Sequence, residues 1–152
     1  MAQAALKRLG LDWVWWMVTP GNPLKAGGNR APLPERIALA RLLYGRGNRH
    51  VSAEGLHEEA VAARVPVSLA TVYNTLHQFT EAGLLREIAV DGTKTYFDTN
   101  TSDHHHFFNE VDGAVSDIPA QSLTLGDIPE APEGMEISRV DVVVRIRPRK
   151  DG

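Results

Sequence analysis

The stretch from Ser68 to Asp98 constrains the fold more than any other part of the sequence, because a helical pattern runs directly into a hairpin pattern. Ser68 is suited to cap the start of a helix and Gly83 to end it, so the spacing predicts a helix over residues 68–83. Two runs rich in β-branched and aromatic residues then flank Asp91-Gly92, a dipeptide typical of tight hairpin turns. The segment is therefore predicted to be a helix followed by a β-ribbon.

The two faces of this predicted helix differ in chemistry. Apolar side chains recur at helical spacing and define the face expected in the core: Leu69, Val72, Leu76 and Phe79. The opposite face carries small or hydrogen-bonding side chains: Ala70, Thr71, Asn74, Thr75, His77 and Gln78. A polar face of this kind is suited to lie in a groove of DNA.

Two further helices are expected before this one. Apolar residues between Pro34 and Tyr44 suit a helix, and Ser52 is placed to cap another that runs to about Ala63. Three helices followed by a β-ribbon describe a winged helix-turn-helix. We expect this DNA-binding domain to span residues 31–98.

The rest of the chain divides into three parts. Residues 1–30 hold a tryptophan-rich run and several Pro and Gly breaks, and they indicate an arm or helix to which we assign no role. Residues 99–102 form a short polar hinge. Residues 103–152 predict two strands about Asp112-Gly113 and a strand over 135–147, which makes an α+β chain with a small second domain. Because such a sheet leaves its edges open, a second copy of the chain is expected to cover it.

Composition and charge exclude several kinds of site and favour DNA as a binding partner. The chain has no cysteine, which excludes disulfides, thiolate zinc sites and cysteine nucleophiles. Its net charge is −3, but residues 98–138 carry nine acidic and no basic side chains, whereas residues 1–97 carry eleven basic and eight acidic ones. This modest positive charge favours DNA binding by two copies. No secretory signal or membrane span is visible, so a cytoplasmic location is expected.

Three consecutive histidines are the sharpest chemical feature. On a strand, His104 and His106 share one face while His105 points away, so two imidazoles could bind one ion. Asp98 and Asp117 lie close by in the sequence, and mixed imidazole and carboxylate ligands suit iron, manganese or zinc in the divalent state. Histidines on a solvated surface loop are the alternative.

Several motifs resemble the ferric uptake regulator family, and most closely its iron response regulator branch. They are HVSAEGLHEEA, VSLATVYNTLHQFTEAGLL, YFDTNTSDHHHF and VSDI, and the likeness covers roughly residues 31–147. The resemblance implies a dimeric, metal-dependent transcription regulator with an N-terminal winged helix and a C-terminal α/β dimerisation domain.

The resemblance also implies the site residues. The regulatory metal ligands of relatives correspond to His50, Asp98, His104, His106 and Asp117. The base-contacting tyrosine corresponds to Tyr73, and Asn74 stands where many relatives have arginine. With the polar face of the helix and the ribbon, the expected DNA contacts are Ser68, Ala70, Thr71, Tyr73, Asn74, His77 and Lys94.

The chain departs from the family pattern in three ways. It lacks the paired CxxC motifs of the structural zinc site and the Cys-Pro haem motif of the iron response regulator branch, because it has no cysteine. Val140 stands where a further histidine of a second metal site is expected, so that site is predicted to be lost.

The sequence thus predicts a metal-responsive, DNA-binding repressor or dual regulator of iron-homeostasis genes. It is expected to work as a homodimer or as a higher oligomer on DNA. One alternative is a haem-responsive regulator that senses through His104, His105 and His106. An alternative of another class is a winged-helix protein-interaction module with a decayed sensor site. An enzyme is not expected, because no positioned nucleophile or substrate-sized glycine loop is present.

Overall fold

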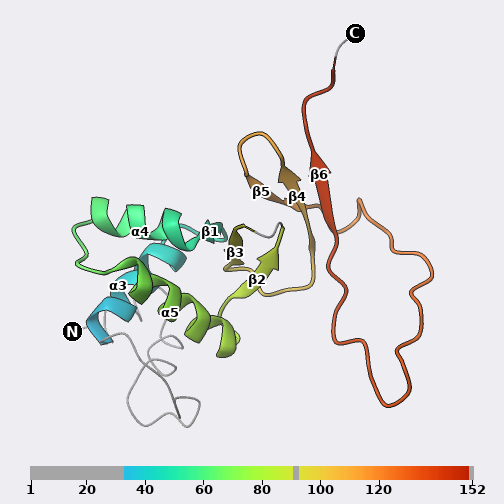
Figure 1. Cartoon of the computed structure of the whole chain (residues 1–152), viewed down its shortest axis with the longest axis horizontal. Helices are drawn as coiled ribbons and strands as arrows, with labels where there is room; N and C mark the ends of the chain where they lie inside the picture. The colour runs from blue at the N-terminus through green and yellow to red at the C-terminus, as the bar shows by residue number, and fades with distance from the viewer. Residues whose placement is uncertain (1–32, 91–92, 151–152) are drawn as a thin grey trace. The chain divides into compact units, whose positions relative to one another are not determined.

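The computed structural model describes residues 33–90 and 93–150. The chain separates into two compact units, Met1–Thr101 (unit 1) and Ser102–Gly152 (unit 2), and each is described by itself (Figure 1). The predicted arm over residues 1–30 and the turn at Asp91-Gly92 lie outside the described residues.

Unit 1 contains the three predicted helices, α3 (Leu33–Tyr44), α4 (Ala53–Ala62) and α5 (Leu69–Glu81). The predicted caps are confirmed. The Ser52 hydroxyl accepts the Gly55 N–H at 3.1 Å, and the Ser68 hydroxyl accepts the Thr71 N–H at the same distance, each at the start of its helix. Beyond α5, Gly83 has a φ of 77°, the left-handed conformation that glycine adopts readily.

A three-stranded antiparallel sheet completes unit 1 in the order β1-β3-β2. Its strands are β1 (His50–Ser52), β2 (Arg86–Ala89) and β3 (Thr95–Asp98). The two arms of the predicted ribbon pair as β2 and β3. Strand β1 was not predicted, since three residues carry no periodic signal and the strand exists through its pairing with β3.

One contiguous core joins the helices to this sheet. Its buried members include Leu39 and Leu43 of α3, Leu56 of α4 and Phe97 of β3. Helix α5 contributes Val72, Leu76 and Phe79 as predicted. The core therefore fixes α5 on its apolar face and supports β3 from the side on which Phe97 lies.

Two positions on α5 were assigned to the wrong face. Leu69, at the first helical position of α5, is 37% exposed and does not lie in the core. Thr75 is fully buried although it was placed on the polar face. Its hydroxyl donates to the Thr71 carbonyl at 2.8 Å, which removes the usual cost of burying a hydroxyl.

Unit 2 is built on a second three-stranded sheet in the order β5-β4-β6. The strands are β4 (His105–Asn109), β5 (Val115–Ile118) and β6 (Val143–Ile146), with β5 antiparallel and β6 parallel to β4. The predicted turn at Asp112-Gly113 joins β4 to β5, and Gly113 has a φ of 71°. Among residues 102–150 no helix forms, so the expected α/β unit has its β part only in the portion described.

The strand predicted over 135–147 is much shorter than expected. Only Val143–Ile146 pairs, because β4 offers a parallel partner from His106 to Asn109 and no further. The residues before Val143 lie in a long irregular connection, where Met135 is 71% and Ile137 is 49% exposed. In the part of the chain that the structure describes, no helix has both the length and the apolar character required to cross a membrane.

Candidate metal centre

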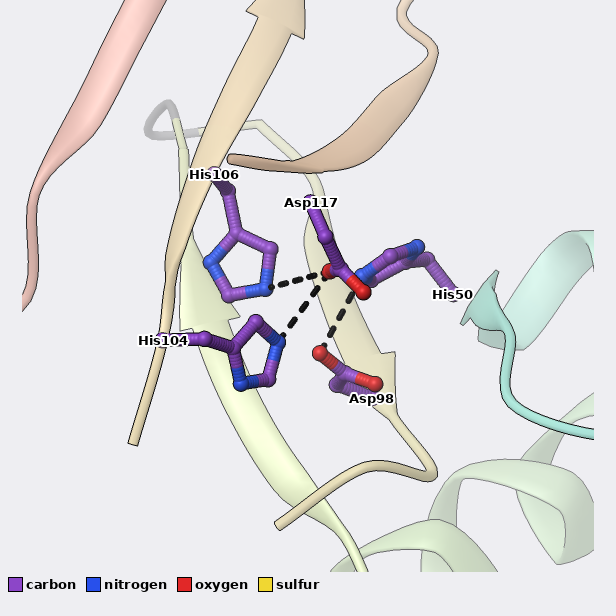
Figure 2. A group of neighbouring side chains, drawn as sticks. All are labelled: His50, Asp98, His104, His106 and Asp117. Carbon is purple, nitrogen blue, oxygen red and sulfur yellow. Dashed lines mark ion pairs between the residues drawn. The ribbon is translucent and has the colours of Figure 1, made fainter. Parts of the chain in front are cut away.

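In unit 1, His50 and Asp98 face each other across the pairing of β1 with β3. The His50 Nε2 and Asp98 Oδ2 atoms are 3.1 Å apart (Figure 2). The other carboxylate oxygen of Asp98, Oδ1, accepts the Asn100 N–H at 2.8 Å. The backbone bond therefore occupies one oxygen and leaves the second directed at the imidazole.

Contacts on the neighbouring residues hold this pair in place. The Arg49 N–H donates to Thr99 Oγ1 at 2.9 Å, and the Thr99 N–H donates to the Arg49 carbonyl at 3.1 Å. The Arg49 guanidinium is paired with Glu59 of α4 and donates to the Leu42 carbonyl of α3 at 3.1 Å. The hydrogen bond from Arg49 lowers the pKa of Glu59. The strand ends that carry His50 and Asp98 are thus tied to two helices.

In unit 2, two histidines share one carboxylate oxygen. Asp117 Oδ1 lies 3.1 Å from His104 Nε2 and 3.5 Å from His106 Nε2 (Figure 2). The two imidazole centroids are 4.4 Å apart. His106 and Asp117 are directly paired between β4 and β5, which places both side chains on the same face of the sheet.

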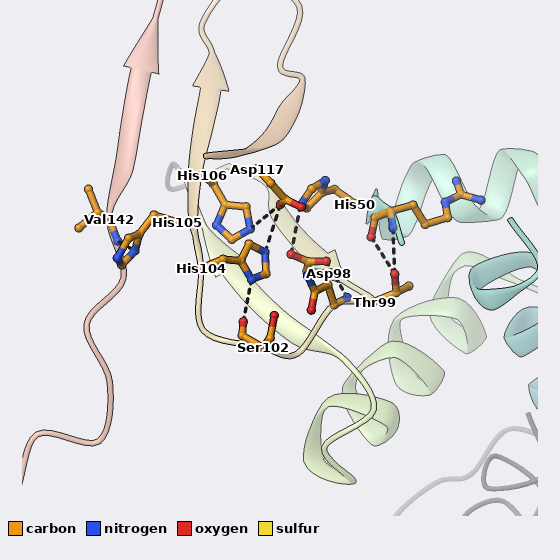
Figure 3. Close-up of polar contacts among 11 residues, drawn as sticks. His50, Asp98, Thr99, Ser102, His104, His105, His106, Asp117 and Val142 are labelled. Carbon is orange, nitrogen blue, oxygen red and sulfur yellow. Dashed lines mark hydrogen bonds and ion pairs between the residues drawn. The ribbon is translucent and has the colours of Figure 1, made fainter. Parts of the chain in front are cut away.

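The middle histidine has a different partner. His105 Nδ1 accepts the Val142 N–H at 3.2 Å and so connects β4 to the chain entering β6 (Figure 3). It pairs with Ile118 in the sheet register, one step from the His106–Asp117 pair. The alternation predicted for the strand therefore separates His105 from the other two.

A backbone contact orients His104. Its Nδ1 lies 2.7 Å from the Ser102 carbonyl, an acceptor that requires a proton on Nδ1 (Figure 3). The neutral ring then carries a lone pair on Nε2, the atom nearest to Asp117. Metal-binding histidines commonly have this arrangement, in which one nitrogen donates to a carbonyl and the other remains a ligand.

The donor atoms of each unit are spaced as ligands of one ion would be. Nitrogen and oxygen donors bind first-row metals at about 2.0–2.2 Å, so two donors on one tetrahedral or octahedral ion lie about 3.0–3.5 Å apart. The separations within both units fall at these values. Nitrogen and oxygen donors without sulfur suit divalent iron, manganese or zinc. Of the five predicted ligands, two are paired within unit 1 and three within unit 2.

The predicted DNA contacts all belong to unit 1. Ala70, Asn74, His77 and Lys94 are exposed, Thr71 and Tyr73 are half-buried, and Ser68 is exposed at the start of α5. The Tyr73 ring stacks on His77 at a centroid distance of 6.4 Å, and His77 meets the edge of Phe97 at 5.6 Å. The polar face of α5 is therefore available to a ligand.

The residues that support these groups were not predicted from the sequence. Arg49 and Thr99 bond to each other next to His50 and Asp98, and the Ser102 carbonyl contacts His104. Glu54 accepts the Tyr73 hydroxyl from another helix. Each of these contacts depends on the tertiary fold or on a backbone atom. The position of Glu54 in the first turn of α4 suits the helix dipole and by itself gives no sign of the contact with Tyr73.

Comparison with known proteins gives matches of two kinds, short ones and longer ones. Over 40 residues the chain is 65% identical to the probable nicotinate-nucleotide adenylyltransferase of Rhizobium meliloti, a match that covers 26% of this chain and 21% of that protein. The chain thus spans about a fifth of that enzyme's length, too little of it to imply its activity here. Over 90 residues it is 37% identical to the ferric uptake regulation protein of Shigella flexneri, which covers 59% of this chain and 60% of the relative.

Solved structures show the same fold. The ferric uptake regulator of Pseudomonas aeruginosa aligns with a TM-score of 0.57 and 22% identity over 99% of both chains. The ferric uptake regulator of Francisella tularensis aligns with a TM-score of 0.62 and 16% identity, over 82% of this chain and 96% of that one. At these identities the likeness shows the fold, a winged helix followed by a dimerisation domain.

The family model described as "Ferric uptake regulator family" matches residues 30–144, which is well over half of the chain. Members of this family are transcription regulators and not enzymes. The motifs, the fold and this match agree, and the protein belongs to the ferric uptake regulator family.

Proposed function

We propose that this chain is a metal-responsive transcription regulator of iron-homeostasis genes, which binds operator DNA as a homodimer in the cytoplasm. The observation that carries the proposal is the arrangement in unit 2, where His104 and His106 share Asp117 while His105 bonds to Val142. Family membership and the exposed polar face of α5 support the DNA-binding part of the proposal.

We infer that the metal ligands are His50, Asp98, His104, His106 and Asp117. The donor set and its spacing support this assignment. The related structures from P. aeruginosa and F. tularensis were solved with manganese and with iron, which favours a divalent ion of this kind. A cation held by donors of both units would stabilise those arrangements of the units in which all five reach it.

The chain's own residues then link metal binding to DNA binding. His50 and Asp98 lie on the sheet that shares a core with α5, so an ion that orients this pair also orients the DNA-binding unit. In a homodimer, the orientation of each unit sets the separation of the two α5 helices. That separation must match two successive major grooves, about 34–36 Å apart. Because coupling between sites is reciprocal, operator DNA should also raise the affinity for metal.

The test uses full-length protein purified without a histidine tag. Metal content is measured by mass spectrometry, and operator binding by a gel-shift assay with and without a chelator, followed by return of Mn²⁺ or anaerobic Fe²⁺. We expect DNA binding to be lost with the chelator and restored by the ion. Salt-dependent DNA binding that ignores the chelator contradicts metal control, and absence of DNA binding favours an interaction module.

Haem titration of the same protein distinguishes haem sensing from binding of a bare metal ion. The haem alternative predicts a Soret band on haem titration that is lost when His104 and His106 are both replaced by alanine. Metal-dependent DNA binding without such a band supports the bare ion.

A further inference from the structure

The tyrosine on the exposed face of α5 is held by a carboxylate from another helix. The Tyr73 hydroxyl donates to Oε1 of Glu54 at 2.5 Å, and Glu54 lies in the first turn of α4. The Tyr73 ring packs against the core of unit 1 and also stacks on His77. These contacts fix both the ring and the direction of its hydroxyl group.

The hydrogen in this bond belongs to the tyrosine. A hydroxyl has one hydrogen and two lone pairs, whereas an ionised carboxylate has lone pairs only. The hydrogen bond from Tyr73 lowers the pKa of Glu54, and the same bond raises the pKa of Tyr73. Both shifts keep the carboxylate ionised and the hydroxyl protonated at neutral pH, so the hydroxyl hydrogen is committed to Glu54.

We propose that Glu54 is a specificity-determining residue, which positions Tyr73 and restricts its hydroxyl to accepting hydrogen bonds from DNA. This inference rests on the proposed function, in which the α5 face carrying Tyr73 meets the bases. It concerns which base edge the tyrosine reads and not whether the chain binds DNA.

The chemistry of the major groove turns this restriction into a base preference. Adenine N6 and cytosine N4 present hydrogen-bond donors there, whereas guanine O6, guanine N7, thymine O4 and the phosphate oxygens present acceptors only. A Tyr73 oxygen with lone pairs alone can contact the amino groups and gains nothing from the acceptors. With Glu54 in place, Tyr73 therefore reads an amino group of adenine or cytosine.

The experiment is selection from a duplex library randomised within each half-site, with Mn²⁺ present and with full-length protein. The variants are Glu54→Ala, Tyr73→Phe and the double variant. Glu58→Ala is the matched control, because it removes an exposed carboxylate from the same helix. Glu54 is only partly buried, so its replacement leaves no core cavity, and circular dichroism checks the fold.

The wild type and Glu58→Ala are expected to favour adenine or cytosine over guanine or thymine at one position, by roughly threefold to tenfold, the scale of one hydrogen bond. Glu54→Ala should lose or reverse this preference, since the freed hydroxyl can donate to O6 or O4. Tyr73→Phe and the double variant should lack it equally, which shows that Glu54 acts through the tyrosine.

Two results separate failure of this inference from failure of the proposed function. If the wild type selects a half-site and Glu54→Ala selects the same bases with the same strength, the role of Glu54 is wrong while DNA binding stands. If the wild type enriches no sequence with Mn²⁺ present, the proposed function itself fails. A change in preference in Glu58→Ala equal to that in Glu54→Ala would also overturn the inference, because charge alone would explain it.

Discussion

The His50–Asp98 pair of unit 1 lies on a sheet that shares a core with three helices. In unit 2, His106 and Asp117 lie on a sheet with little buried apolar surface, and His104 comes directly before its strand β4. Among the described residues of unit 2, the buried apolar side chains are Phe108 and Ile118. The two groups have similar donor spacings despite this difference.

The two ligand groups thus have similar geometry, but the rest of the fold supports them to different degrees. In unit 1 the position of the pair follows from a core that forms within a single chain. A three-stranded sheet with two buried apolar side chains is marginal by itself. The ligands of unit 2 should therefore depend on further burial, which we expect a second copy of the chain to supply. Four predictions test or refine this contrast.

The largest effect should follow from removing the ligands of unit 2. Replacing His104 and His106 together by alanine should weaken binding of Mn²⁺ by about 100-fold or more, because two of the proposed donors are lost. His105→Ala is the matched control and should change affinity by less than about tenfold. Isothermal titration calorimetry measures both. Equal losses in the two proteins would show that the strand does not divide the histidines into ligands and a structural residue.

The second prediction concerns the two cores. Leu76→Ala in α5 should lower the free energy of unfolding of the metal-free protein by about 2–5 kcal/mol, the usual cost of such a cavity. Ile137→Ala, at a position 49% exposed in the single chain, should cost no more than about 0.5 kcal/mol in a monomer. Urea denaturation at several protein concentrations measures both. A cost above about 1 kcal/mol for Ile137→Ala that grows with concentration would show that another copy covers it.

A third prediction tests the support of the unit 1 pair. Thr99→Ala removes the hydroxyl that accepts the Arg49 N–H beside His50, and it should weaken Mn²⁺ binding by roughly tenfold. Thr101→Ala changes an exposed threonine nearby and should have little effect. Competition with a fluorescent chelator measures the affinities. If both variants bind as the wild type does, the Arg49–Thr99 contacts support the fold without tuning the ligands.

The smallest expected effect is the pH dependence that Glu59 confers on unit 1. The hydrogen bond from Arg49 lowers the pKa of Glu59 in the folded chain, so its stabilisation is present above the unfolded value of about 4.5 and is lost as the pH falls further. Both side chains are partly exposed, which limits the effect to less than about 1 kcal/mol. Urea titrations between pH 3 and 6 give the free energy of unfolding at each pH. This free energy should change less steeply with pH in Glu59→Gln than in the exposed Glu58→Gln. Identical slopes would rule out this contribution.

Local signals carried most of what the sequence predicted about the fold. The serine caps at Ser52 and Ser68 and the turns about Asp112-Gly113 depend on neighbouring residues, and these predictions are confirmed. The strand β1 was missed, because pairing with a distant strand defines it. The long strand over 135–147 was overpredicted because alternation of apolar residues does not provide a pairing partner.

The site, too, has features that follow from neighbouring residues and features that depend on the tertiary fold. Alternation on one strand separated His104 and His106 from His105, while the wider ligand set came from the family resemblance and stays a proposal. The carboxylate oxygen that two imidazoles share, and the carbonyl that orients His104, depend on how β4 and β5 register and on the backbone at Ser102. The contact between Glu54 and Tyr73 joins two helices and could not be predicted from either one.

The separation of His105, which bonds to Val142, from the other two histidines has a consequence for how this protein tolerates deletions. Adjacent strand residues point to opposite sides, so deletion of any one of the three histidines leaves two that face apart. Such a deletion mutant would still have two histidines here, but their side chains could not both bind one ion. Replacing His105 by another residue would instead leave His104 and His106 on the same face. Losing any one of these three codons should therefore do more harm than altering the codon for His105.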